Sequence, residues 1–160
     1  DLHRSREALL KYVGFVAKYE RIGKCAKALH YLKKIYHCRI FDELGALKQF
    51  TLNHMAHCFF EGKDYNSALE LTKAYLSAAA GEQRLVGLFN AIVCCRTLLN
   101  HSHEAFYCDA YAREAKRLDS KAHCFFSSIH NVLHCVGVDK VSKAKRLLRV
   151  SLSGTEGGVR

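Results

Sequence analysis

The 160-residue sequence is strongly basic, with 25 Lys and Arg against 15 Asp and Glu, and it is 49 % hydrophobic without any proline. This apolar fraction excludes a disordered or fibrous chain. No stretch approaches the roughly 20 uncharged apolar residues of a membrane-spanning helix, and the first ten residues lack the apolar run of a signal peptide. We therefore expect one folded domain that does not contact a membrane.

The eight cysteines lie within apolar segments and not at regularly spaced loop positions. Buried, unpaired cysteines of this kind are typical of a reducing compartment. This predicts an intracellular protein, in the cytoplasm or the nucleus. The cysteines are Cys25, Cys38, Cys58, Cys94, Cys95, Cys108, Cys124 and Cys135.

Four segments share a pattern in which a turn precedes a helix that carries alanine at a matching position. These alanines are Ala28, Ala68, Ala105 and Ala144, at intervals of 40, 37 and 39 residues. A small residue lets the two helices of a hairpin cross closely, and a fixed period of this length indicates stacked hairpins. The fold class predicted is therefore all-α, as a right-handed α-solenoid of about four antiparallel hairpins.

In chain order, hydrophobic periodicity predicts eight helices in one domain, residues 1–151, followed by a flexible tail or linker at 152–160. The helices are expected near residues 4–21, 25–40, 44–61, 65–79, 83–99, 103–117, 120–136 and 140–151. They form repeat units at about 4–41, 42–80, 81–118 and 119–151. Helix-boundary rules place C-terminal glycines at Gly23 and Gly62, and N-caps at Asp64, Ser102 and Asp139.

The second unit, "LNHMAHCFFEGKDYNSALELTKAYL", resembles the tetratricopeptide repeat superfamily. The residues that match its large-small-large signature are Leu52, Met55, Ala56, Phe59, Tyr65 and Ala68. The first unit matches through Tyr12, Phe15, Tyr19, Gly23 and Ala28. The third and fourth units depart from it, with Ser102 and Val141 where an aromatic residue is usual, and the closing proline of the family is absent. The resemblance spans roughly residues 8–151 and implies a solenoid like those of adaptor and regulatory proteins.

In such arrays the first helix of each hairpin lines the concave face, which implies a place for a ligand. Asn53 and Asn90 both lie 15 residues before their marker alanine, and Asn131 lies 13 before its own. Side-chain amides can grip the backbone of an extended peptide, because each offers a donor and an acceptor. The expected peptide-binding residues are Asn53, His57, Phe60, Asn90, Cys94 and Asn131. The alternative is that these are ordinary polar residues of helix surfaces.

The histidines and cysteines include two pairs with the i,i+4 spacing of helical metal ligands, His54/Cys58 and His130/His134. The pairs lie about two repeats apart, so we expect no metal site and no cofactor. The sequence contains no nucleophile elbow and no glycine-rich phosphate loop. We therefore predict no catalytic residues and a binding protein, although a helical arm of a larger enzyme stays possible as an interpretation.

Basic residues concentrate at both ends: residues 1–40 carry ten Lys/Arg against three acids, and 121–160 carry seven against two. The expected basic patches are Arg4, Lys11, Lys18, Lys24, Lys140, Lys143, Arg146 and Arg149. They are typical of a solvated face, but they also fit nucleic acid or an acidic protein as partner. Few aromatic residues interleave these charges, which disfavours base stacking.

The leading functional hypothesis is a scaffold or adaptor that binds a protein or peptide in its groove. The alternatives are a basic helical-repeat module for nucleic acid or an acidic protein, and a structural arm of a larger complex. The arm hypothesis predicts self-association through uncapped terminal helices, since the first helix carries an apolar set. That set is Leu9, Leu10, Val13 and Val16.

Overall fold

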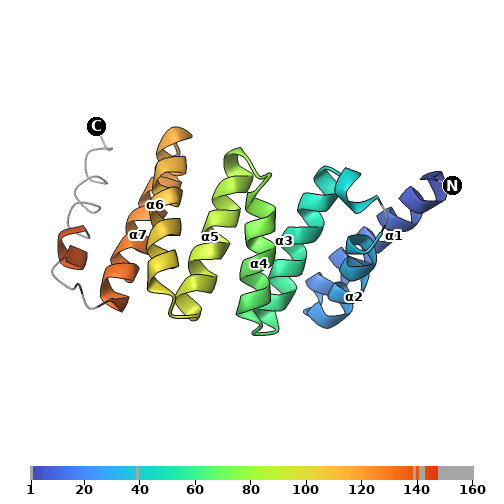
Figure 1. Cartoon of the computed structure of the whole chain (residues 1–160), viewed down its shortest axis with the longest axis horizontal. Helices are drawn as coiled ribbons and strands as arrows, with labels where there is room; N and C mark the ends of the chain where they lie inside the picture. The colour runs from blue at the N-terminus through green and yellow to red at the C-terminus, as the bar shows by residue number, and fades with distance from the viewer. Residues whose placement is uncertain (1, 39, 139, 141–142, 148–160) are drawn as a thin grey trace. The chain divides into compact units, whose positions relative to one another are not determined.

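The computed structural model describes residues 2–38, 40–138, 140 and 143–147, and side chains from Arg6 onward (Figure 1). The described residues are helical apart from the connecting segments, which confirms the all-α prediction. The chain divides into two compact units, Asp1–Ala78 and Ala79–Arg160. This boundary lies two residues before the predicted junction between the second and third repeats, at 80/81. No described helix is long and apolar enough to cross a membrane.

Unit 1, Asp1–Ala78, contains two helical hairpins. Its helices are α1 (Leu2–Arg21), α2 (Cys25–Tyr36), α3 (Ala46–Glu61) and α4 (Tyr65–Leu76), with the 3-10 helix η1 (Phe41–Glu43) between the hairpins. Each α-helix packs on the next along the chain. The sequence predicted that α2 would reach residue 40, but it ends at Tyr36 and η1 follows.

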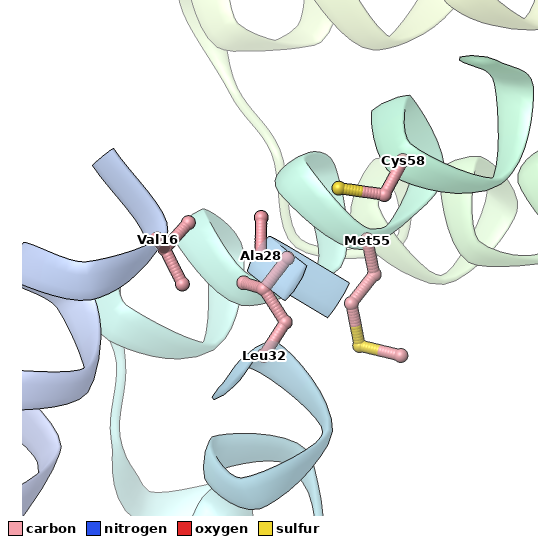
Figure 2. Packing of buried hydrophobic residues seen from close by; sticks show 5 residues of the cluster. All are labelled: Val16, Ala28, Leu32, Met55 and Cys58. Atoms are coloured by element: carbon pink, nitrogen blue, oxygen red, sulfur yellow. The ribbon is translucent and has the colours of Figure 1, made fainter. Parts of the chain in front are cut away.

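The core of unit 1 joins three helices. Figure 2 shows Val16 from α1, Ala28 and Leu32 from α2, and Met55 and Cys58 from α3. Val16, Ala28 and Leu32 have no exposed surface. Because α2 contributes a residue as small as Ala28 here, α1 and α3 can both approach it closely.

Unit 2, Ala79–Arg160, contains α5 (Gly81–Thr97), α6 (His101–Arg117) and α7 (Lys121–Gly137). Helix α6 packs on both α5 and α7, and α5 also contacts α7. Residues 143–147 are helical as well, inside the predicted helix 140–151. The rest of that predicted helix and the predicted tail 152–160 lie outside the described residues.

One turn geometry recurs after the first helix of each hairpin. In each of these turns a backbone N–H donates to a carbonyl five residues earlier, over 2.7 to 2.9 Å, as in a Schellman motif. These turn carbonyls belong to Tyr19, Phe59, Cys95 and Cys135, and their donors are Lys24, Asp64, Asn100 and Lys140. Three of the turns contain a described residue with positive φ, namely Gly23, Lys63 and Leu99. The turn carbonyls therefore supply a common origin for numbering each repeat.

This origin corrects one of the four predicted marker positions. Ala28, Ala68 and Ala144 each donate their N–H to the carbonyl of the turn donor four positions earlier, and each is buried. The equivalent residue on α6 is Glu104, not Ala105, because Glu104 donates to Asn100 at 2.9 Å. A carboxylate thus occupies the position where the other repeats have alanine.

The helix caps follow the predictions in part. Asp64 caps α4, since its carboxylate accepts from the Ser67 N–H at 3.1 Å. Ser102 was the wrong choice for α6, because the Asn100 side chain accepts from the His103 N–H instead. Gly62 follows α3 with φ −75°, and its neighbour Lys63 takes the left-handed conformation. Asp139 lies outside the described residues.

Candidate functional site

The three predicted asparagines do not share a position in the repeat. Counted from the turn carbonyls, Asn53 lies six residues before its origin, Asn90 five and Asn131 four. One residue turns a helix by about 100°, so the three side chains leave their helices in different directions. The prediction aligned them through Ala105, and the one-residue error at that position produced the apparent match between Asn53 and Asn90.

The other predicted peptide-binding residues differ in exposure. His57 is exposed, whereas Phe60 is half-buried and packs on Tyr65 with ring centres 5.1 Å apart. Cys94 is only 2 % exposed, so its side chain is not available to a ligand at the surface. Burial, followed by the charge of Cys95, raises the pKa of the Cys94 thiol to about 11.

The common origin reveals a different surface feature in unit 2, which we call the apolar stripe. It occupies the positions nine, six and two residues before the turn carbonyl on both α5 and α7. Its members are Val86, Phe89 and Val93 on α5, and Phe126, Ile129 and Leu133 on α7. Residues at this spacing lie on one face of a helix. The exposed fractions are 41 % for Phe89, 47 % for Phe126 and 46 % for Leu133.

The same positions are less apolar in unit 1. They hold Leu10, Val13 and Ala17 on α1, and Phe50, Asn53 and His57 on α3. The ring centres of Phe50 and His54 lie 4.0 Å apart, so Phe50 packs against a polar neighbour. The larger exposed hydrophobic surface at these positions therefore belongs to unit 2.

A buried histidine lies beneath the apolar stripe and links its two helices. His130 of α7 is 7 % exposed, and its ring centre lies 5.1 Å from that of Phe89 on α5. The Tyr111 ring of α6 also lies edge-on to it, with ring centres 5.9 Å apart. Burial lowers the pKa of His130, and the charge of Arg96 lowers it further against the opposing effect of Glu104. The ring therefore packs as a neutral group.

A cluster of charged side chains adjoins His130. Arg96 of α5 donates through Nη2 to the carbonyl of His130 at 3.3 Å and through Nε to Glu104 Oε1 at 2.6 Å. The other carboxylate oxygen, Oε2, lies 3.0 Å from His134 Nδ1 of α7. Glu104 itself is 1 % exposed. These contacts tie α5, α6 and α7 together under the apolar stripe.

The carboxylate of Glu104 is held in its ionised form. Burial alone would raise the pKa of Glu104, because it removes the charged form from water. Hydrogen bonds from His134 and Arg96, together with their charges, outweigh burial and leave this pKa below its ordinary value. Buried carboxylates are tolerated under such conditions, when a cation and hydrogen bonds compensate them.

Unit 1 carries a related contact at the equivalent positions. Glu20 takes the place of Arg96, and His54 that of His130, with His54 Nδ1 2.7 Å from Glu20 Oε2. Cys58, which corresponds to His134, lies with its sulfur 3.9 Å from Glu20 Oε1. Burial, then the charges of Cys25 and Glu20, raises the pKa of Cys58 to about 12.

The sequence prediction noticed these pairs but missed their partners. His54/Cys58 and His130/His134 were judged as one possible four-ligand set spread over two repeats. In the structure each pair instead meets an acidic residue of its own unit, Glu20 or Glu104. Numbering from the turn would have found this relation, because the two pairs occupy the same two positions of the repeat.

The predicted basic patches are exposed wherever their side chains are described. These residues are Lys11, Lys18 and Lys24 in unit 1, and Lys140, Lys143 and Arg146 in unit 2. The side chain of Arg4 and all of Arg149 lie outside the described part of the chain. Aromatic rings do accompany basic groups in unit 1, since the Lys27 ammonium lies 5.6 Å from the centre of the Tyr19 ring. That ring is stacked on Tyr31, so the aromatic surface is largely used within the unit.

The apolar set on α1 is only partly available for self-association. Leu9 is 5 % exposed and Val16 is fully buried, so both belong to the core of unit 1. Leu10 is 70 % exposed and Val13 is half-buried. Of the predicted set, only those two residues are therefore open to a partner.

All eight cysteines are free. Five of them are buried, as the sequence led us to expect, whereas Cys124 is exposed. Burial also raises the pKa of Cys108 to about 12, with the charge of Glu104 as the next cause. Because the thiolate is the reactive form, Cys58, Cys94 and Cys108 are poor nucleophiles.

No family model, no curated protein and no solved structure matches this chain. The similarity to tetratricopeptide repeats therefore rests on the residues and spacing of the sequence. A function has to be argued from the surfaces of the chain itself.

Proposed function

We propose that this chain is a protein-interaction module that binds a hydrophobic segment of a partner protein along the apolar stripe of unit 2. The observation that carries the proposal is the exposure of four members of the stripe on two contacting helices, Val86 and Phe89 on α5 and Phe126 and Leu133 on α7. Contiguous exposed apolar side chains of this size are typical of protein-binding surfaces. The partner segment would present large apolar side chains at helical spacing, as an amphipathic helix does.

The charged cluster supports this role by holding the two helices of the stripe in place. Arg96 contacts both His130 and Glu104, and Glu104 contacts His134. Hydrogen bonds therefore connect α5 and α7 to each other and to α6. A binding surface whose backbone is fixed before binding loses less conformational entropy on association. The predicted peptide residues Asn53 and His57 lie at the corresponding positions of unit 1, where this face is more polar.

We further propose that the hairpins build a right-handed α-solenoid of the tetratricopeptide type. The support is the recurrence of one turn and of a buried alanine at Ala28, Ala68 and Ala144. Hairpins of this kind bury their apolar faces on one another, which gives repeat arrays their extended binding surfaces. A scaffold or adaptor role follows from that architecture.

The proposal predicts that polar substitutions in the stripe abolish partner binding. Phe89→Ser combined with Leu133→Ser should weaken binding by at least about tenfold, because buried aromatic and aliphatic anchors dominate such interfaces. The matched control combines Phe106→Ser with Leu99→Ser, which are 61 % and 73 % exposed outside the stripe. Affinity capture from nuclease-treated lysate would identify the partner. Titration of the purified partner segment against the wild type and the two double variants would then give the affinities. An equal loss of affinity in both double variants, or wild-type affinity in the stripe variant, would contradict the proposal.

A second candidate function is binding of nucleic acid or an acidic protein by the basic residues of unit 1. The exposed side chains of Lys11, Lys18 and Lys24 favour it. Salt distinguishes the two functions, because phosphate contacts release counterions and weaken steeply as ionic strength rises. An apolar interface should keep most of its affinity from about 50 to about 300 mM salt, a range that includes physiological ionic strength. If neither surface binds a ligand, the remaining interpretation is a structural arm of a larger complex.

A further inference from the structure

We propose that His101, Glu104 and His134 form a binding site for one divalent transition-metal ion, with Zn²⁺ the best match, between α6 and α7. Nothing in the proposed partner binding requires this site. The proposal rests on the arrangement of three side chains around the buried carboxylate described above.

The donor atoms of the three side chains converge. One ligand atom from each residue lies within 4.8 Å of those of the other two, and no other group of three such residues does so in the described part of the chain. His134 Nδ1 lies 3.0 Å and His101 Nδ1 3.5 Å from the same oxygen, Glu104 Oε2. The ligand atoms of a tetrahedral zinc ion are separated by about 3.3 Å, given bonds of about 2.0 to 2.1 Å. Two of the three separations are therefore already close to those of a filled site.

His101 provides a second, independent observation. Its Nδ1 atom is buried and has no hydrogen-bond partner among the described residues. Buried ring nitrogens are normally hydrogen-bonded, so one that faces a carboxylate oxygen at 3.5 Å without a hydrogen bond needs an explanation. The ring also lies against the α7 backbone, since a Cβ built on Gly137 would meet His101 Cε1 at 3.7 Å. A metal ion bound to Nδ1 would satisfy this nitrogen.

The surroundings of the cluster suit a metal site of this type. Two imidazoles and one carboxylate match zinc and similar first-row ions and disfavour Mg²⁺ and Ca²⁺, which prefer oxygen ligands alone. The other charged group at the cluster is Arg96, which holds Oε1 at 2.6 Å and leaves Oε2 facing the histidines. Hydrogen bonds to the outer oxygen of a ligating carboxylate are usual and fix its orientation. Three protein ligands leave a fourth position for water.

The sequence also explains why the first two hairpins lack this site. His101 and Glu104 are separated by three residues on α6, so both face the same side of the helix. Where the first hairpin contacts the second, the equivalent positions hold other residues. Cys25 replaces His101, Ala28 replaces Glu104 and Cys58 replaces His134. Alanine at the central position removes the carboxylate there. The metal site therefore depends on Glu104, the residue that breaks the alanine pattern.

The test is metal titration of the full chain with ZnCl₂, followed by calorimetry and by the thermal unfolding midpoint. The decisive variant is His101→Ala, because it removes a nitrogen that makes no hydrogen bond in the metal-free protein. The matched control is His103→Ala, on the same helix, exposed and bonded only to the Asn100 side chain in the contacts described. Cobalt replaces zinc in a parallel titration, since thiolate ligation produces an intense charge-transfer band and imidazole-carboxylate ligation does not.

The expected result is one site per chain that raises the unfolding midpoint, gives no thiolate band with cobalt, and binds at least about tenfold more weakly after His101→Ala. His103→Ala should bind like the wild type. The result that would overturn the proposal is absence of stoichiometric binding, a thiolate band that assigns the metal to cysteines, or equal affinity in wild type and His101→Ala with the fold retained by circular dichroism.

Discussion

Replacing Glu104 with alanine is expected to lower the free energy of unfolding of unit 2 by about 2–4 kcal/mol, although alanine is the residue that other repeats carry at this position. The carboxylate is 1 % exposed and accepts from Arg96 at 2.6 Å. Removing it leaves the Arg96 guanidinium without its counter-ion, although the Arg96 side chain is only 29 % exposed. It also leaves His134 without its acceptor. Urea unfolding followed by circular dichroism measures the effect, and hydrogen exchange of α6 peptides assigns it to unit 2.

Two further variants make this prediction specific. Asp109→Ala removes an exposed carboxylate from the same helix and should change stability by less than about 0.5 kcal/mol. Arg96→Val added to Glu104→Ala removes the stranded charge and introduces the residue found at the equivalent position of α7, Val136. Replacing both partners of a buried ion pair by apolar groups is often close to neutral. A double variant no more stable than Glu104→Ala would contradict the account of the cluster.

The effect of Glu104→Ala should also depend on pH in a definite direction. The folded-state pKa of Glu104 lies below its ordinary value, so its stabilisation is fully present above the unfolded pKa and is lost as pH falls through the folded one. The difference between wild type and Glu104→Ala should therefore shrink as the pH is lowered below about 4.5. A difference that stays constant from neutral pH into this range would show that the ionised carboxylate contributes nothing.

Replacing Leu32 with alanine is expected to destabilise unit 1 by about 2–5 kcal/mol, because it removes a fully buried side chain from the cluster of Figure 2. Leu32 lies in α2 and packs in a cluster to which both α1 and α3 contribute. The loss combines the transfer of apolar atoms with the cavity left behind. Leu10→Ala deletes the same atoms from a residue that is 70 % exposed, and should stay within about 0.5 kcal/mol of wild type. Similar losses in the two variants would mean that Leu32 is not a core residue.

The helices were predictable because each carries its own local signal. Hydrophobic periodicity placed all seven described α-helices close to their observed ranges, and Asp64 acts as the cap that its position before α4 predicted. The 3-10 helix after Tyr36 was not predicted, since three residues are too few to show a period. Asn100 was missed as a cap because the neighbouring Ser102 has an equally suitable side chain.

The candidate site was predicted less well, and the reason is geometric. One alanine, Ala105, was aligned with the others when the adjacent Glu104 occupies the equivalent position. A one-residue shift changes the direction of a helical side chain by about 100°, which is enough to exchange a buried residue for an exposed one. Cys94 was assigned to the surface for this reason, and Phe89 was overlooked. Numbering from the turns, whose geometry is set by the backbone, avoids the error.

Site-specific photocrosslinking tests the central claim, that the apolar stripe of unit 2 is the surface that binds a partner protein. A benzophenone side chain placed at Phe89 or at Phe126 should form adducts with the same partner segment, because both residues are exposed on the stripe. The same group at Phe106, which is exposed on α6 outside the stripe, should give little or none. Comparable adducts from position 106, or adducts with unrelated proteins from positions 89 and 126, would contradict the claim.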